Sequence, residues 1–155
     1  MHEEQVHLRR GVATDAAVIA EYNIAMALET EAKILDPATV RRGVEAVIAD
    51  PAKGFYLLAE TDGLVVGQAM VTFEWSDWRD GLFWWVQSVY VHPDARRQGV
   101  FARLFGALEA EGRRRPEVVG LRLYVDQENL AAQKTYRRLG MAVSNYALME
   151  REFEE

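Results

Sequence analysis

The sequence predicts an α+β fold, a mixed sheet flanked by helices, in a single domain spanning residues 1–155. Half of the 155 residues are hydrophobic, and this length and composition suit one buried core. Three consecutive runs rich in β-branched and aromatic residues occupy the middle of the chain, and a strand-helix-strand pattern follows them. This order of elements indicates an antiparallel part of the sheet joined to a parallel crossover.

The N-terminal third is expected to form one strand and two helices. Residues 6–12 have the pattern of a strand, and Thr14 or Asp15 can cap the helix that follows. The apolar stripe expected on that helix comprises Val18, Tyr22, Ala25 and Met26. The second helix is expected between Asp36-Pro37, an N-cap followed by proline, and Asp50-Pro51.

The middle of the chain is expected to form an antiparallel meander. Its three strands are residues 54–60, 64–75 and 82–91. Asp62-Gly63 and Asp80-Gly81 separate these runs and are dipeptides typical of hairpin turns.

The C-terminal part alternates helices and strands. The third helix is expected to bury an apolar stripe formed by Phe101, Leu104, Phe105 and Leu108. A strand over residues 118–125 follows, and Asn129 then caps a fourth helix that ends at Gly140. A final strand is expected near residues 142–151.

Charge and composition exclude several classes of function. The net charge of −6, from 18 basic and 24 acidic residues, repels phosphate backbones, so we expect no nucleic-acid partner. A cationic or amine ligand would not be repelled. No run approaches the roughly 20 apolar residues of a membrane span, so no membrane partner is expected. The absence of cysteine excludes thiolate chemistry and, with the lack of an apolar leader, favours a cytoplasmic location.

The segment Arg96-Arg97-Gln98-Gly99 is a candidate anion-binding loop. It lies between an expected strand and the N-terminus of a helix, where free backbone amides and the helix dipole favour an anion. A glycine there allows a ligand to approach the backbone closely. Taken alone, the segment is more typical of a solvated turn with a basic helix start.

Other cofactor motifs are missing from the sequence. It contains no G-x-G, which a dinucleotide fingerprint needs, and no G-K-[ST], which a Walker loop needs. The three histidines, His2, His7 and His92, lie in none of the spacings that place two metal ligands on one face. We therefore expect no metal, no dinucleotide and no ATP.

Two linked motifs resemble those of the GNAT superfamily of acyl-CoA-dependent N-acetyltransferases. The positions matching V-x-P-x-x-R-x-x-G and then N-x-x-A-x-x-x-Y-x-x-x-G are Val91, Pro93, Arg96, Gly99, Asn129, Ala132, Tyr136 and Gly140. The element order fits that fold over residues 6–152. The resemblance implies a central mixed sheet of six to seven strands flanked by four helices, with acetyl-CoA as co-substrate.

Two positions depart from the family pattern. Phe101 stands where glycine or alanine is usual, so it either narrows the rim of the pyrophosphate site or points into the core. Its place on the apolar stripe of the helix favours the core. Met141 replaces a common aromatic residue with another large apolar side chain, which changes little.

The resemblance also assigns roles to individual residues. It implies that the backbone of Val89, Tyr90 and Val91 binds the pantetheine arm, while the pyrophosphate lies at Arg96, Arg97, Gln98, Gly99, Val100 and Phe101. Asn129 would cap the fourth helix and contact the arm. Tyr136 would donate a proton to the departing thiolate, although a purely structural place in the core is the alternative for this side chain.

Glu74 is the first candidate for the general base. It lies between Phe73 and Trp75 near the end of an apolar run, and a carboxylate between aromatics could have a raised pKa. An outward-facing strand residue is an equally good interpretation. Asp77 and Asp80 in the same hairpin are further candidates.

These observations lead us to expect an N-acetyltransferase that moves an acetyl group from acetyl-CoA to a primary amine of a small molecule, amino acid or peptide by direct transfer. A set of aromatic residues could line an acceptor pocket or pack in the core or at a homodimer interface: Phe73, Trp75, Trp78, Trp84 and Trp85. A catalytically silent acyl-CoA-binding module, and an aromatic-lined protein for an unrelated ligand, remain the alternatives.

Overall fold

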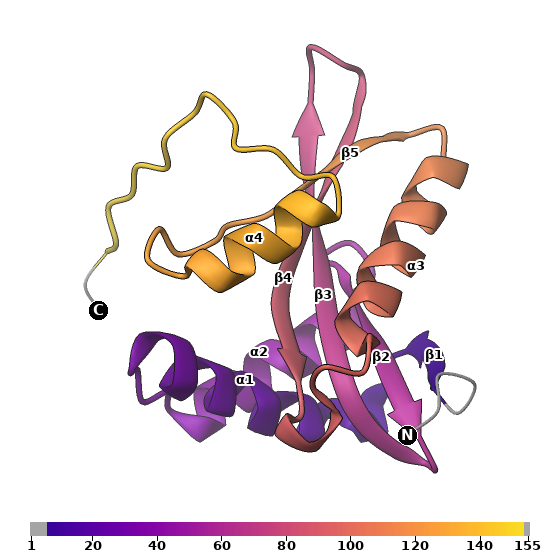
Figure 1. The fold of residues 1–155 in the computed structure, drawn as a ribbon, viewed down its shortest axis with the longest axis vertical. Helices are drawn as coiled ribbons and strands as arrows, with labels where there is room; N and C mark the ends of the chain where they lie inside the picture. The colour runs from indigo at the N-terminus through magenta and orange to yellow at the C-terminus, as the bar shows by residue number, and fades with distance from the viewer. Residues whose placement is uncertain (1–5, 154–155) are drawn as a thin grey trace. The chain divides into compact units, whose positions relative to one another are not determined.

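The computed structural model describes residues 6–153 and divides into two compact units, one ending at Tyr124 and one beginning at Val125. The first unit contains a five-stranded sheet in the order β1-β2-β3-β4-β5 (Figure 1). Its strands are β1 (His7–Arg10), β2 (Phe55–Thr61), β3 (Leu64–Ser76), β4 (Gly81–Val91) and β5 (Val118–Arg122). Neighbours are antiparallel except β4 and β5, which are parallel.

The described residues form four α-helices: α1 (Ala16–Glu31), α2 (Pro37–Ala49) and α3 (Val100–Arg114) in the first unit, and α4 (Leu130–Arg138) in the second. Two short 3₁₀ helices, η2 (Ala13–Asp15) and η3 (Pro93–Ala95), precede α1 and α3. The β4-α3-β5 crossover confirms the predicted strand-helix-strand unit, and the predicted α+β class is correct. No helix among residues 6–153 is long and apolar enough to cross a membrane.

The expected count of six to seven strands is wrong, because residues 6–153 form five. The segment 142–151, predicted to be the final strand, is not a strand in the described chain. A strand is stable only when its backbone groups pair with a neighbour. The second unit offers one regular element, the helix α4, so its own residues provide no strand for this segment to pair with.

The two N-terminal helices agree with the sequence-based predictions to different extents. Asp36 caps α2 as predicted, because its carboxylate accepts a hydrogen bond from Thr39 N at 3.1 Å. The predicted stripe of α1 is correct only in part: Val18 packs against the core cluster, but the residues that α1 buries are Ala16, Ile19, Ala20 and Ala27. The sequence of α1 is apolar on nearly every side, so helical periodicity alone does not determine which side faces the core.

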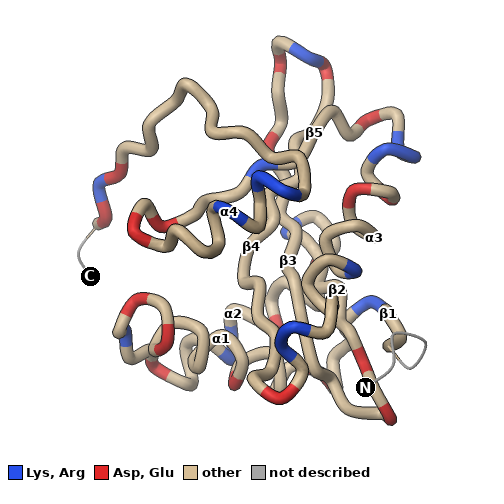
Figure 2. Tube along the Cα trace, in the orientation of Figure 1, with Lys and Arg blue, Asp and Glu red and all other residues tan. Residues whose placement is uncertain are grey.

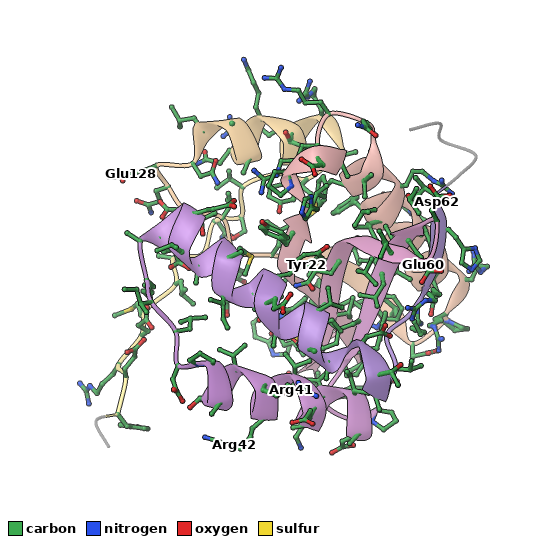
Figure 3. All side chains as sticks on the ribbon, turned by 90° about the horizontal axis from the view of Figure 1, so that it is seen from below. Tyr22, Arg41, Arg42, Glu60, Asp62 and Glu128 are labelled. Carbon is green, nitrogen blue, oxygen red and sulfur yellow. The ribbon has the colours of Figure 1, made fainter. Side chains whose placement is uncertain are left out.

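The sheet separates two apolar clusters. On one face α3 packs Leu104 and Leu108 over strand residues that include Val71, Trp84 and Val86. On the other face α1 and α2 pack over Tyr56 and Leu58 of β2. Figure 3 shows Tyr22 between α1 and the strands, where its hydroxyl donates to the carbonyl of Val65 in β3.

Both predicted hairpins form, with different turns. Asp62 and Gly63 have φ of 51° and 78° and make a two-residue turn, as predicted. In the second hairpin four residues, Asp77–Asp80, join β3 to β4, and Gly81 already pairs with Ser76. Glycine is required there for space, since a Cβ at Gly81 would lie 2.5 Å from Cγ1 of Val119 in β5.

An ion pair fixes β1 to the start of α1. Arg9 binds both carboxylate oxygens of Asp15, each at 2.8 Å, and Val12 N donates to the same carboxylate at 2.7 Å. The Asp15 side chain is 8% exposed. Hydrogen bonds from Arg9 are the main reason why the pKa of Asp15 lies below its usual value.

We therefore expect Asp15→Asn to lower the free energy of unfolding by about 2 kcal/mol at pH 7, since a charge-assisted hydrogen bond is lost. The folded-state pKa of Asp15 is depressed, so its contribution is complete above the unfolded pKa of about 4 and declines as pH falls through the folded value. Urea unfolding of both proteins between pH 7 and pH 3 should show the difference shrinking with acid. Asp77→Asn, in an exposed turn, is the control.

Candidate active site

One edge of β4 is open over half of its length. Pairing between β4 and β5 runs from Leu82 opposite Val118 to Trp85 opposite Arg122, where β5 ends. Beyond Trp85, β4 continues to Val91 with no strand of the described chain on that side. Unpaired backbone groups on this stretch are available to a ligand.

A β-bulge at Ser88 determines which groups of β4 face the opening. Ser88 has φ of 50°, and the pairing with β3 shifts register there. Gln68 of β3 is fully buried and donates from Nε2 to the Ser88 carbonyl at 3.1 Å. The same Nε2 donates to Asn23 Oδ1 of α1 at 2.8 Å, which fixes the amide below the bulge.

Beyond the bulge, pairing fixes the direction of the backbone. His92 N donates to Val66 O, whereas Val91 O accepts from the Arg96 side chain rather than from β3. Since alternate residues of an antiparallel strand face one neighbour, the backbone of Val89 and Val91 turns to the open edge and that of Tyr90 turns to β3. Of the three residues predicted to bind the pantetheine arm, two therefore present their backbone to the opening.

The loop after β4 ends in an open cradle. Gly99 is the N-cap of α3 with φ of 79°, and a Cβ added there would meet no atom within 4 Å. The first backbone bond of the helix, from Arg103 N to Gly99 O, leaves the amides of the first turn for another acceptor. Basic positions lie directly before this helix (Figure 2). The site therefore fits an anion such as a pyrophosphate.

The two arginines of this loop have different environments. Arg96 donates to Val91 O and to Glu29 Oε2, both at 2.8 Å, and its guanidinium lies 5.3 Å from the Tyr90 ring centroid. Tyr90 Oη in turn donates to Glu29 Oε1, and the bond to Arg96 is the main cause of the lowered pKa of Glu29. Arg97 is exposed and has no hydrogen-bond or ion-pair partner in the described chain. Arg97 is thus the more available cation for a ligand.

The remaining residues predicted for the anion site have side chains that serve the fold. Gln98 donates to Asp94 O at 3.3 Å and closes the loop. Val100 is 2% exposed and belongs to the core, while the Phe101 ring packs 6.0 Å from that of Phe105. The favoured expectation that Phe101 follows the apolar stripe agrees with this contact.

The raised pKa expected for Glu74 is wrong. Its Oε1 accepts from Trp85 Nε1 and from Arg122 Nη1, each at 2.8 Å. These contacts lower the pKa of Glu74, with the indole hydrogen bond as the main cause and the guanidinium of Arg122 adding to it. Glu74 therefore stays ionised at neutral pH and is a weak proton acceptor. Asp77 and Asp80 are exposed in the turn between β3 and β4.

The aromatic residues considered together as a possible acceptor pocket lie in different surroundings. Trp84 is 2% exposed and packs with Phe73 in the core beneath α3. Trp75 and Trp78 project from the hairpin, at 59% and 86% exposure. Only Trp85 lies beside the opening, with its ring 4.6 Å from that of Tyr124.

The second unit carries the other predicted site residues. Asn129 caps α4 by accepting from Ala132 N at 3.1 Å, as predicted. Tyr136 is half-buried on this helix, and desolvation raises the pKa of its phenol. Gly140, with φ of 95°, ends the helix as predicted, and Met141 N bonds back to Tyr136 O.

The model of the Acetyltransferase (GNAT) family matches residues 20–141, which is most of the chain. The chain belongs to the GNAT family of acetyltransferases. A possible acetyltransferase from Clostridium difficile 630 is 40% identical, with a TM-score of 0.93 over 97% of this chain and 99% of that one. A comparison with curated proteins gave no match.

Two more distant solved structures share the GNAT fold. A ribosomal-protein-alanine N-acetyltransferase from Brucella melitensis biovar Abortus 2308 is 20% identical, with a TM-score of 0.77 over 96% of this chain and 99% of that one. A predicted acetyltransferase from Clostridium acetobutylicum, solved with acetyl-CoA, is 14% identical, with a TM-score of 0.78 over 94% of this chain and 96% of that one.

Sequence analysis missed four residues that shape this site: Gln68, Ser88, Glu29 and Arg122. Gln68 had a detectable signal, because it is a single amide within the apolar run of β3. The positive φ of Ser88 and the long-range partners of Glu29 and Arg122 have no signal in the local pattern.

We expect Gly99→Val to lower the affinity for acetyl-CoA by about tenfold or more, because the side chain fills the cradle and strains the backbone. Gly63→Val is a matched control: Gly63 has φ of 78° and open space around its Cβ, but lies in the turn between β2 and β3. Calorimetric titration should show a loss only in the Gly99 variant. If the two variants bind acetyl-CoA with equal affinity, Gly99 is not part of the binding site.

Arg97→Ala should weaken acetyl-CoA binding about threefold to tenfold at low salt, with less effect at high salt, since an exposed charge is screened. Arg114→Ala removes another exposed arginine, at the opposite end of α3, and should leave binding unchanged. Titrations at two ionic strengths compare the variants. A salt-independent loss in Arg97→Ala would indicate a distorted loop instead of a lost charge contact.

Proposed function

We propose that this protein transfers an acetyl group from acetyl-CoA to a primary amine by direct attack, without an acyl-enzyme. Its family membership supports acetyl transfer, and the observation that carries the proposal is the open edge of β4 leading to the cradle at Gly99. A hydrogen-bonding edge followed by an anion-binding helix start suits a long ligand with an amide arm and a pyrophosphate. We further propose that both units act as one catalytic domain.

Each part of the opening would hold a different part of the co-substrate. The outward backbone of Val89 and Val91 would bind the amides of the pantetheine arm, while the amides at the start of α3 and the Arg97 side chain would hold the pyrophosphate. The buried amide of Gln68 would keep the bulge in place. When bound, acetyl-CoA supplies an activated acyl group as a thioester.

Protons must balance in the transfer. A bond forms between the amine nitrogen and the acetyl carbon, and the thioester C–S bond breaks. An acceptor that arrives as an ammonium ion loses two protons, one to the departing thiolate and one to solvent. Because Glu74 is held ionised by Trp85 and Arg122, it suits binding of the ammonium better than removal of its proton.

Tyr136 is proposed as the donor of the proton to the thiolate, and the phenolate then regains a proton that the acceptor amine loses. The N-x-x-A-x-x-x-Y motif supports this role, and so does the protonation state of the phenol. Desolvation raises the pKa of Tyr136, so the phenol carries its proton throughout the neutral range. Asn129 fixes the start of the same helix.

Tyr136→Phe should lower kcat by about tenfold to a thousandfold, because the ring remains and the proton is lost. Acetyl-CoA affinity and Tm should change little. Tyr146→Phe removes the same hydroxyl from an exposed ring of the second unit and should retain full activity. The measurements are steady-state thiol release with a panel of amines, and calorimetry for binding.

Full activity of Tyr136→Phe would show that Tyr136 is a packing residue and not the proton donor. A fall in Tm without a fall in kcat would identify its hydroxyl as a structural hydrogen bond. A wild-type protein that binds no acetyl-CoA at micromolar concentration would refute the proposed function itself.

A further inference from the structure

A mixed acidic, basic and aromatic cluster lies where β4 and β5 separate. We call Glu74, Phe83, Trp85, Arg122 and Tyr124 the separation cluster. Trp85 and Arg122 form the last paired position of the two strands, so the cluster borders the start of the open edge. All five side chains belong to the first unit.

The α3 face of the sheet is closed at this point. On the α3 face, Trp84 and Val86 are 2% and 3% exposed and pack in the core. Trp85, one residue from each of them, points to the other face, because side chains alternate along a strand. There Tyr124 remains 56% exposed. The separation cluster is therefore the partly exposed group of side chains beside the start of the open edge.

The Glu74–Arg122 ion pair is incomplete on both sides. Both hydrogen bonds to Glu74 go to Oε1, and neither Glu74 Oε2 nor Arg122 Nη2 has a partner in the part of the chain that the structure describes. The two side chains are 41% and 30% exposed. The pair thus offers solvent one carboxylate oxygen beside one end of a guanidinium.

Aromatic rings hold these charges in place. The Arg122 guanidinium lies 3.7 Å from the Phe83 ring centroid, and the Trp85 indole holds Glu74 while its ring contacts Tyr124. A guanidinium stacked on a ring loses little further side-chain freedom when it binds a carboxylate. Arg79, which also lowers the pKa of Glu74, is the other cation facing this carboxylate.

We propose that the acceptor is a zwitterion whose reacting amine is adjacent to a carboxylate, as in a free amino acid. The ammonium would bind Glu74 Oε2 and the carboxylate Arg122 Nη2. A simple monoamine bound at Glu74 would leave its cation beside the guanidinium of Arg122, and a monoanion bound at Arg122 would lie beside the Glu74 carboxylate, so a dipolar ligand matches the pair best. This inference rests on the proposed acetyl transfer.

The test compares free amino acids with their decarboxylated amines and their amino-acid amides, which keep the side chain and lose the carboxylate. Steady-state thiol release should give a kcat/KM about tenfold or more higher for the best amino acid than for its two analogues. Arg122→Gln should bring these ratios close to one, mainly by raising KM for the amino acid. Arg113→Gln removes an exposed ion pair with Glu109 and should keep the preference.

Binding gives a second measurement that does not depend on turnover. Calorimetry with CoA-saturated protein should show the amino acid binding more tightly than its amine, and Arg122→Gln should abolish that difference. Equal binding, or faster acetylation of the amine or amide, would overturn the zwitterion proposal while acetyl transfer stands. Absence of acetyl-CoA binding in the same calorimeter would instead refute the proposed function. A preference that survives Arg122→Gln would also overturn the assignment.

Discussion

The hydrogen bond from Gln68 Nε2 to the Ser88 carbonyl constrains the rest of the site. An extra residue in β4 interrupts the ladder to β3, and a side-chain amide from β3 replaces the lost backbone partner. Because the bulge reverses the alternation, Val89 and Val91 pack on the α3 face and Tyr90 faces α1. Without that reversal, Tyr90 could not donate to Glu29, the carboxylate that also binds Arg96 of the loop before α3.

This arrangement has an energetic cost within the core. Gln68 Oε1 is buried and has no hydrogen-bond partner among residues 6–153, a cost of about 1–3 kcal/mol for a neutral group. The other end of the amide bonds to two acceptors, Asn23 Oδ1 and Ser88 O. A leucine at this position would remove the cost and also the support of the bulge, so the polar residue serves the shape of the edge more than stability.

Sequence reasoning succeeded where the determinant is local. Asp36 caps its helix through a residue three positions away, and Asp62-Gly63 makes a turn with its own backbone, so both were predictable. Glu74 was misjudged because its pKa depends mainly on Trp85 in the neighbouring strand, 11 positions away, and also on Arg122, 48 positions away. Residues 142–151 have the pattern of a strand. A strand forms only when it pairs with a second segment, and the pattern of one segment does not show whether such a partner lies beside it. Membership of the family followed from spaced motifs. The different environments of Arg96 and Arg97 could not be predicted, because they depend on Glu29, which is 67 positions from Arg96 in the sequence.

The four tryptophans occupy a short stretch from Trp75 to Trp85, and their surroundings differ sharply. Trp78 is almost fully in water and Trp84 is almost fully in the core, so their emission should be insensitive to a ligand at the β4 edge. Trp85 donates its indole N–H to a carboxylate at that edge, which makes it a fluorophore next to a charge. The protein thus carries an intrinsic optical reporter at the point where the strands separate, and occupancy of the opening can be followed without a label.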